Sequence, residues 1–322
     1  MLKRNKEKNV LITGGFGLLG GRIAHYLDHR GYQITLGTRQ TKTKTPSWLP
    51  RATVLTIDWD NKNSLIQACH NKEYIIHAAG MNAKDSEAKP AAALKFNGNI
   101  TDRFIKIAAE QGVSRFIFLS TAHVYSSHLE GQINEESKTT NTHPYARSNL
   151  TGEESVISID KKRELEGVVL RLSNAFGAPM HKHADCWMLI ANDLCRQAVT
   201  EKVLTLYSDG SQLRDYISID AVCNSIYEIL KNDFSTMTKK VLNIGSGITM
   251  SALEMAKLIQ DRSSLILGYK PGLIVKSETN IDEVKSFSYR SINMDKIGIE
   301  ISSDPITEID SLLRFCNENF SP

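Results

Sequence analysis

The sequence of 322 residues lacks the features that mark secreted and metal-binding proteins. Its five cysteines are scattered, odd in number, and include no Cys-x-x-Cys pair. This pattern is typical of free thiols in a reducing cytosol and argues against a disulfide framework or a structural zinc site. The net charge of +3 is small, so composition gives no electrostatic reason to expect a nucleic-acid partner. We therefore expect a cytoplasmic protein.

A long hydrophobic run is missing after the basic start of the chain. MLKRNKEK is followed only by the short run NVLI before a glycine cluster, which is too short for a signal peptide or a membrane span. A solvated tail before a first strand, and no membrane association, is the simpler expectation. The chain is otherwise 41% hydrophobic and 23% charged, as expected for a globular protein of one large or two modest domains.

Strand-like and helix-like segments alternate along the first half of the chain. Such repeated units predict a Rossmann-type α/β fold with a doubly wound parallel sheet. No linker separates the halves, so we expect an interleaved, smaller, mixed substrate domain: residues 1–172 with 215–245 form the dinucleotide-binding domain, and 173–214 with 246–322 the second. The expected strands are 9–15, 32–39, 52–59, 74–80, 167–177 and 240–247, and 115–125 is expected as a strand running into a loop. The expected helices are 18–31, 64–71, 99–112, 186–199 and 218–230.

A glycine-rich turn follows the first expected strand. LITGGFGLLGG places Gly14, Gly17 and Gly20 at three-residue spacing, and Gly15 also allows a GxGxxG pattern. Glycines there permit a tight turn and let a pyrophosphate approach bare backbone at a helix N-terminus. The strand before and the helix after favour dinucleotide binding, with Phe16 and Leu18 beside the cofactor, over a turn without a ligand.

An acidic residue is missing at the end of the second expected strand, where it would bind a free ribose 2′-hydroxyl. The sequence there is LGTRQ, and a guanidinium at Arg39 would suit a 2′-phosphate. We therefore favour NADP(H) over NAD(H), although Arg39 is otherwise an ordinary surface residue. In TIDWD, Asp58 either reaches the adenine, with Trp59 beside it, or caps a turn.

From this turn onward the sequence resembles the extended short-chain dehydrogenase/reductase family, whose members mostly act on nucleotide-activated sugars. The resemblance implies a homodimer formed through the helices after Asn97 and around Tyr145, and an active site between the two domains. It implies cofactor contacts at Ala78, Ala79, Gly80 and Asn97, an active-site hydroxyl at Thr121, a proton-transferring Tyr145, and a diphosphate contact at Arg214. The matching segments are TGGFGLLG, IIHAAG, FNGNIT, FIFLSTAHVYS, HPYARSNL, RLSNAFGAP, SDGSQLRDYISIDAV, VLNIGSG and SINMDKIGIE.

The sequence departs from the family at one catalytic position, because Asn149 stands where the YxxxK motif has lysine. In the family this lysine holds the nicotinamide ribose, and its charge favours the phenolate. A unit charge at about 4 Å and effective dielectric 20 is worth about 4 kcal/mol, close to three pKa units. Asn149 still offers hydrogen bonds to ribose but no charge, and Arg147 faces the other side of a helix. The expected activity is therefore reduction of a keto group on a nucleotide sugar; the alternatives are an epimerase, or a cofactor-binding protein with a degenerate site.

Acidic residues are also missing after Thr121, where family members that dehydrate the sugar carry an acid pair. Ala122 and His123 stand there instead, which argues against a 4,6-dehydratase. His123 is either a proton donor near the substrate or a structural histidine, and Asn174 either binds substrate or caps a turn. His181, His183 and Cys186 are close in sequence, but we expect no metal because nothing else completes a ligand set.

Overall fold

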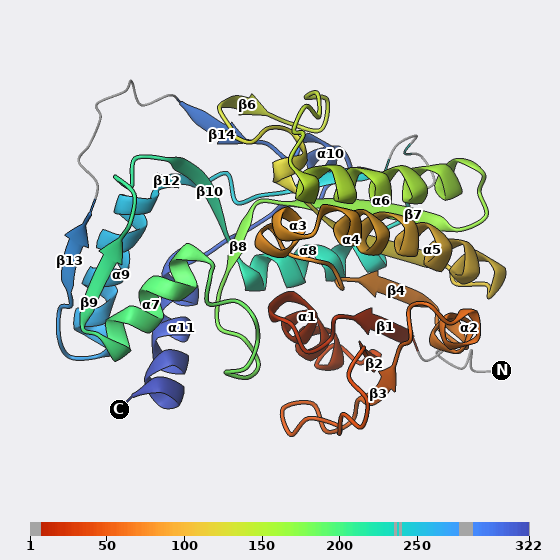
Figure 1. Ribbon diagram of the computed structural model, residues 1–322, viewed down its shortest axis with the longest axis horizontal. Coiled ribbons are helices and arrows are strands. Elements are labelled where there is room, and N and C mark those ends of the chain that lie inside the picture. The colour runs from red at the N-terminus through yellow and green to blue at the C-terminus, as the bar shows by residue number, and fades with distance from the viewer. Residues whose placement is uncertain (1–7, 235–236, 238–239, 277–285, 322) are drawn as a thin grey trace. The chain divides into compact units, whose positions relative to one another are not determined.

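The computed structural model describes residues 8–234, 237, 240–276 and 286–321 (Figure 1). The chain divides into two compact units. The first contains the residues up to Ser127 together with Lys138–Arg171 and Ile229–Leu242, and the second contains His128–Ser137, Leu172–Glu228 and the residues from Asn243 onward. The domain limits expected from the sequence stay a prediction.

The first unit is built on a parallel sheet of seven strands in the order β11-β7-β5-β4-β1-β2-β3. This confirms the expected Rossmann-type α/β class. The order runs outward in both directions from the neighbours β1 and β4, so the topological switch point lies between them, and ligands of open α/β sheets bind beyond the carboxyl ends of such strands. The strands are β1 (Asn9–Thr13), β2 (Gln33–Thr38), β3 (Thr53–Thr56), β4 (Tyr74–His77), β5 (Arg115–Thr121), β7 (Glu166–Leu172) and β11 (Val241–Ile244).

Helices alternate with these strands, and α5 and α6 run side by side (Figure 1). On α5 the apolar residues recur at helical spacing, so the helix buries Phe104, Ile105, Ile107 and Ala108 against the sheet. Pro144 occupies the first turn of α6, where its missing N–H costs nothing. The helices are α1 (Leu18–Asp28), α2 (Lys62–Cys69), α3 (Ala83–Ala88), α4 (Pro90–Ala93), a π-helix η1 (Leu94–Ile100), α5 (Thr101–Glu110), a 3₁₀ turn η2 (Ala122–Val124), α6 (Pro144–Lys161) and α8 (Ile219–Lys231).

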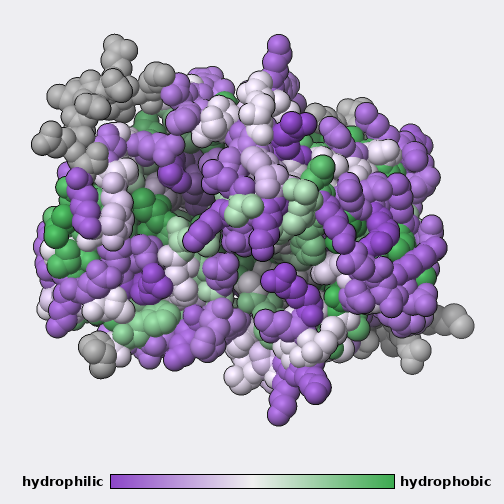
Figure 2. All heavy atoms as spheres, viewed as in Figure 1, coloured by the Kyte–Doolittle hydropathy of each residue, from purple (hydrophilic) through white to green (hydrophobic). Residues whose placement is uncertain are grey.

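The second unit packs α7, α9 and α11 together with small sheets around its own core. α7, α9 and α11 bury apolar residues such as Leu194, Met255 and Leu312. On the face seen in Figure 2, apolar side chains gather at the outer edge near β13, where Ile274 and Val275 are exposed. The sheets join β8 (Asn174–Phe176), β10 (Leu213–Ser218) and β12 (Thr249–Ser251); β9 (Val203–Leu206) and β13 (Gly272–Val275); and β6 (Gly131–Ile133) and β14 (Phe287–Tyr289), while the helices are α7 (Ile190–Thr200), α9 (Ala252–Ile266), α10 (Ile292–Lys296) and α11 (Pro305–Phe320).

Two expected elements were wrong in their extent. The strand expected over 167–177 is two strands: β7 ends at Leu172, and Asn174 pairs instead with Tyr216 of β10 in another sheet. The helix expected from residue 186 begins only at Ile190, because Cys186 accepts a turn hydrogen bond from Leu189 and the Trp187 indole donates to the Lys182 carbonyl. Among the described residues, no helix is long and apolar enough to span a membrane.

Candidate active site

The glycine turn between β1 and α1 provides a bare backbone surface. Gly14 has φ +64°, and a Cβ there would lie 3.0 Å from the carbonyl oxygen of Ala78. A Cβ on Gly20 would lie 2.3 Å from the Gly14 carbonyl oxygen, so α1 packs directly on the turn. Gly17, at the N-cap of α1, is exposed, and a Cβ there would meet only the Gly14 carbonyl oxygen at 3.3 Å. These are the three roles that a pyrophosphate-binding turn requires, so the residues fit a dinucleotide.

A buried histidine joins the two strands at the switch point. His77 Nδ1 lies 2.8 Å from the Thr13 hydroxyl, and its Nε2 lies 3.2 Å from the Thr101 hydroxyl. The Thr13 hydroxyl also accepts the backbone N–H of Ala79 at 3.1 Å. Burial lowers the pKa of His77 to about 3, so the ring is neutral. The chain thus holds the Ala78–Ala79 turn against Gly14, with Gly80 exposed beside it.

Asn97, expected beside the cofactor, uses its side chain to connect three elements. Its Oδ1 accepts the Met81 N–H at 2.8 Å, while its Nδ2 donates to the Met81 carbonyl at 3.3 Å and to the Ser148 hydroxyl at 3.1 Å. The residue lies in the π-helix η1 and is buried. Asn97 therefore fixes the loop after β4 against α6. The sequence carried no signal for Met81 or Ser148 as its partners.

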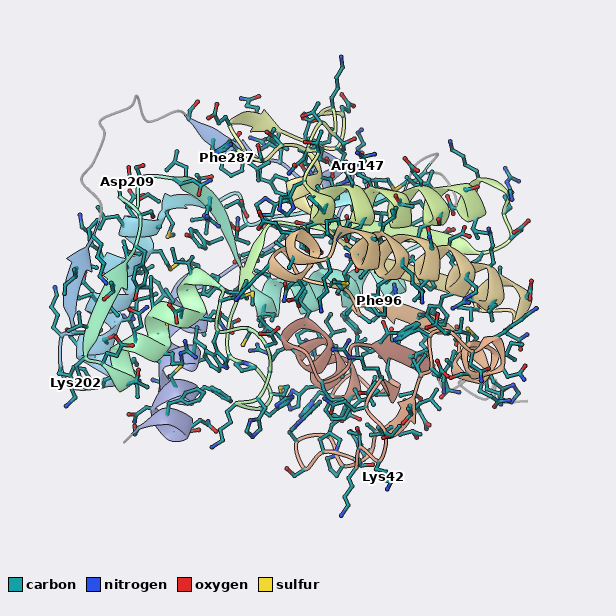
Figure 3. All side chains as sticks on the ribbon, in the orientation of Figure 1. Lys42, Phe96, Arg147, Lys202, Asp209 and Phe287 are labelled. Atoms are coloured by element: carbon teal, nitrogen blue, oxygen red, sulfur yellow. The ribbon has the colours of Figure 1, made fainter. Side chains whose placement is uncertain are left out.

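The residues expected near the adenosine differ in their surroundings. Arg39 follows β2 and is exposed, at the start of a basic loop whose outer tip carries Lys42 (Figure 3). Asp58 is exposed, and its Oδ1 accepts the Asp60 N–H at 3.1 Å, so the turn-capping role is present. Trp59 is buried edge-on against His77, Phe96 and Phe104. Its indole packs in the core.

Thr121 and Tyr145 come together where β5 ends and α6 begins. Thr121 is the last residue of β5, and its side chain is hydrogen-bonded to the Tyr145 hydroxyl. Burial raises the pKa of Tyr145 above its ordinary value, and this hydrogen bond opposes the rise. Within the described part of the chain, no lysine or arginine is among the groups that shift this pKa. The phenol therefore holds its proton at neutral pH.

The side chain of Asn149 is bonded within its own helix, whereas the lysine of the YxxxK motif would carry an ammonium group. Its Nδ2 donates a hydrogen bond of 2.8 Å to the Tyr145 carbonyl, one turn back in α6, and the Ser148 hydroxyl donates to the same carbonyl at 3.0 Å. The side chain is buried, 6% exposed, yet its Oδ1 has no partner among the described residues and is not sealed from solvent. Asn149 therefore offers a neutral hydrogen-bond acceptor, and it places no positive charge near the phenol. Arg147 lies exposed on α6 (Figure 3).

Polar contacts around His123 fix the start of α6. The His123 N–H donates to the Thr121 hydroxyl at 3.2 Å, and its carbonyl accepts from Asn141 Nδ2 at 2.6 Å. Asn141 Oδ1 accepts the His143 N–H at 2.9 Å, and His143 Nδ1 in turn accepts the Tyr145 N–H at 3.2 Å as the cap of α6. His123 therefore contributes through its backbone to the geometry of the pair. Asn141 and His143 were missed from the sequence.

Asn174 and Arg214, expected to bind substrate, lie together in the second unit. Arg214 Nη1 donates to Asn174 Oδ1 at 3.5 Å, and Arg214 Nη2 donates to Gln212 at 2.8 Å, while its Nε is buried without a partner. Asn174 Nδ2 donates to the Asp215 carbonyl at 3.0 Å. Asp215 itself is buried and accepts from Ser173 and from the Ser246 and Gly247 N–H groups. The guanidinium thus retains donor capacity for an anion.

The histidines of the MHKHADC segment are not gathered into a metal site. The rings of His181 and His183 are 6.4 Å apart, and Cys186 is buried with Asn192 donating to its sulfur at 3.6 Å. Over the described ranges, no group of three or more His, Cys, Asp or Glu side chains could hold a metal ion.

The chain matches, over residues 10–245, the family model described as NAD dependent epimerase/dehydratase family. The chain belongs to this family. It is thus an NAD-dependent enzyme of the extended short-chain dehydrogenase type, as the motifs indicated. The matched range includes the glycine turn, Thr121, Tyr145 and Arg214.

Relatives of the epimerase/dehydratase family cover most of the chain at low identity. UDP-glucose 4-epimerase 2 of Arabidopsis thaliana is 27% identical over 300 residues, covering 82% of this chain and 85% of its own. The solved UDP-glucose 4-epimerase of Thermotoga maritima with UDP-glucose has TM-score 0.81 and 20% identity, covering 96% and 99% of the two chains. MoeE5 in complex with UDP-glucose and NAD has TM-score 0.78 at 20% identity, with the same coverage. The curated relatives include both epimerases and dehydratases.

Proposed function

We propose that this enzyme reduces a keto group on a nucleotide-activated sugar, with Tyr145 as the proton donor. The observation that carries the proposal is the raised pKa of Tyr145, opposed only by the Thr121 hydrogen bond. Bound NAD(P)H supplies hydride to the carbonyl carbon. Thr121 hydrogen-bonds the reacting oxygen, and Asn149 Oδ1 accepts a hydrogen bond from a ribose hydroxyl. A neutral phenol suffices to protonate an alkoxide, whereas removing a proton from a sugar hydroxyl requires the phenolate.

An epimerase is the second candidate, and the comparisons support it better than the reductase. Curated relatives named as epimerases and as a dehydratase match most of the chain. An epimerase oxidises and then reduces the same carbon, so Tyr145 would act first as base and then as acid. The absent acid pair after Thr121 disfavours the dehydratase. A cofactor-binding protein with little turnover is the third candidate, since loss of the lysine is what decay of the site would produce.

The test compares both half-reactions on the full chain. NADPH or NADH consumption with a 4-keto nucleotide sugar should exceed NAD(P)⁺ reduction with the corresponding alcohol at pH 7. Tyr145→Phe should lower the reductive rate by about 10²–10⁴-fold while cofactor binding persists. A rate of alcohol oxidation equal to or faster than the rate of keto-group reduction would refute the proposed direction of the reaction. Interconversion of UDP-glucose and UDP-galactose without net cofactor consumption, with NAD(H) copurifying, would establish the epimerase instead.

The finer points of ligand choice follow from the charged residues. Arg39 supports NADP(H), because a guanidinium and not a carboxylate follows β2. MoeE5 and DesIV of Streptomyces venezuelae, two solved neighbours, were determined with NAD bound. Arg214 supports a nucleotide diphosphate, with Asn174 beside it. A homodimer through η1, α5 and α6 rests on the resemblance to the family, and it stays a prediction.

A further inference from the structure

A buried ion pair lies on the same stripe of α6 as the candidate catalytic residues. Tyr145, Asn149 and Glu153 follow at four-residue spacing, so they share one helix face. Glu153 is 1% exposed, and Arg171 of β7 is 4% exposed. Arg171 Nε and Nη2 donate to the Glu153 carboxylate at 3.0 and 2.6 Å, and its guanidinium lies 4.7 Å from the centre of the Tyr125 ring.

The same carboxylate reaches the end of β5. The Ser120 hydroxyl donates to Glu153 Oε1 at 2.5 Å, and Ser120 is buried. The next residue is Thr121, whose side chain holds the Tyr145 hydroxyl. Two consecutive residues of β5 are thus bonded to α6, one to the phenol and one to an acid two turns further along the helix. The bonds fix how α6 lies along the strand.

Close packing of backbone supports this fixed approach. A Cβ on Gly152, the residue before Glu153, would lie 2.6 Å from the Asn97 carbonyl oxygen and 2.8 Å from the Phe118 ring. At Gly152 the helix backbone therefore lies directly against the η1 backbone and against the Phe118 ring of β5. A shift of α6 by even a fraction of a turn would break both the Ser120 and the Thr121 contacts.

Stability alone does not account for burying these charges. Desolvating two ions is costly, and replacing a buried pair with apolar residues of similar volume is often neutral or stabilising. We propose that Ser120, Glu153 and Arg171 are positioning residues, which fix the register of α6 on β5 so that the Tyr145 hydroxyl meets Thr121. This inference rests on the proposed catalytic role of Tyr145.

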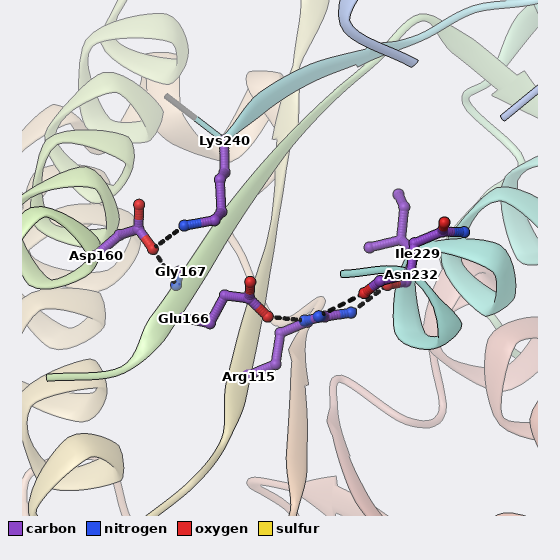
Figure 4. A network of polar contacts seen from close by, with 7 residues as sticks. All are labelled: Arg115, Asp160, Glu166, Gly167, Ile229, Asn232 and Lys240. Atoms are coloured by element: carbon purple, nitrogen blue, oxygen red, sulfur yellow. Dashed lines mark hydrogen bonds and ion pairs between the residues drawn. The ribbon is translucent and has the colours of Figure 1, made fainter. Parts of the chain in front are cut away.

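The chain offers a matched control at the other end of α6. Lys240 Nζ donates to Asp160 Oδ1 at 2.7 Å, and Asp160 also accepts the Gly167 N–H (Figure 4). Both side chains are largely buried, each 10% exposed, although less so than Glu153 and Arg171. Asp160 follows Glu153 by seven residues on the same face of α6. This pair anchors the helix at the end remote from Tyr145, so its loss should affect stability but not the register at Thr121.

The experiment compares Ser120→Ala, the double variant Glu153→Met with Arg171→Met, and Lys240→Met. Ser120→Ala keeps the ion pair intact and decides the proposal. We expect its kcat to fall on the order of tenfold to a hundredfold, with KM for the nucleotide sugar and Kd for the cofactor unchanged within about twofold. The double variant should remain folded with a similarly reduced kcat, and Lys240→Met should keep the wild-type kcat. Wild-type kcat in Ser120→Ala would overturn the proposal.

A second readout separates this proposal from the proposed function. Tyrosine labelled with ¹³C at the ring ζ carbon reports the hydrogen bond and ionisation of Tyr145, whose signal Tyr145→Phe identifies. In Ser120→Ala that signal should move and the pKa of Tyr145 should rise, because the opposing Thr121 bond is weakened; Lys240→Met should leave both unchanged. If the wild type converts no nucleotide sugar, the proposed function is wrong. The Tyr145 signal still tests the positioning role, because it requires no turnover. An unchanged Tyr145 signal in Ser120→Ala would contradict the positioning role.

Discussion

The side-chain amide of Asn149 donates a 2.8 Å hydrogen bond to the main-chain carbonyl of Tyr145. Residue 149 carries a cation in the family's YxxxK motif. In this chain its side-chain nitrogen is bonded within α6, and only its amide oxygen remains for other contacts. The electrostatics of Tyr145 follow from this arrangement, because burial raises the pKa of the phenol and no charge at residue 149 opposes it.

Restoring the cation at this position should lower the pKa of Tyr145. Asn149→Lys should shift the pH profile of alcohol oxidation to lower pH, by up to about three units if the charge lies near 4 Å. Asn149→Met, uncharged and of similar length, is the control and should not shift the profile. A large gain in rate from near zero would indicate a degenerate site, whereas an unchanged or lower rate would indicate a working site built around asparagine.

Two glycines of the cofactor turn should respond oppositely to alanine. Gly17→Ala meets only one backbone oxygen, at 3.3 Å, so we expect a nearly unchanged Tm but cofactor binding weakened by about tenfold or more, because the methyl group occupies the approach of the pyrophosphate. Gly20→Ala places a methyl group 2.3 Å from the Gly14 carbonyl oxygen and should cost about 1–3 kcal/mol of stability. Thermal unfolding and titration calorimetry measure both. Equal cofactor affinity in Gly17→Ala and the wild type would contradict the assignment of the turn.

Cofactor discrimination should depend on Arg39. Arg39→Ala should weaken NADPH binding by about 1.5–3 kcal/mol, the value of a hydrogen bond to a charged group, and leave NADH binding unchanged. Arg51→Ala is the matched control, because Arg51 ends the same loop but is paired with Asp28 at 2.7 Å. A uniform effect of Arg39→Ala on both cofactors would remove the basis for an NADP(H) preference.

Acid should destabilise the protein through His77. Its pKa is lowered from 6.5 to about 3 in the folded state, so between these values the unfolded chain binds the extra proton. The contribution of neutral His77 to the free energy of unfolding is therefore fully present above about pH 6.5. Below that pH the free energy of unfolding falls by up to about 1.4 kcal/mol per pH unit. His77→Gln should flatten the dependence of unfolding free energy on pH over this range, measured with denaturant. A slope identical to that of the wild type would show that His77 is not buried as a neutral ring.

Much of the first unit could be predicted from the sequence because the signals there are local. Apolar runs followed by glycine, and helical spacing of Phe104, Ile105 and Ala108, specify strands and helices without knowledge of their partners. The change from β7 to β8 could not be predicted this way, since GVVLRLSNAFG contains no proline and no internal glycine to mark a break. The break depends on Asn174 pairing with Tyr216, which is distant in sequence.

The sequence by itself determined the family, the glycine turn, the positions of Thr121 and Tyr145, and the missing lysine, because each of these is a matter of residue type at a fixed spacing. Only the tertiary structure decided how those residues act. The Asn97 side chain joining Met81 to Ser148 and the Ser120–Glu153–Arg171 contacts depend on which groups folding brings within about 3 Å of one another. Packing determines which hydrogen bonds and ion pairs form between separate elements, and the spacing of residues in the sequence does not predict them.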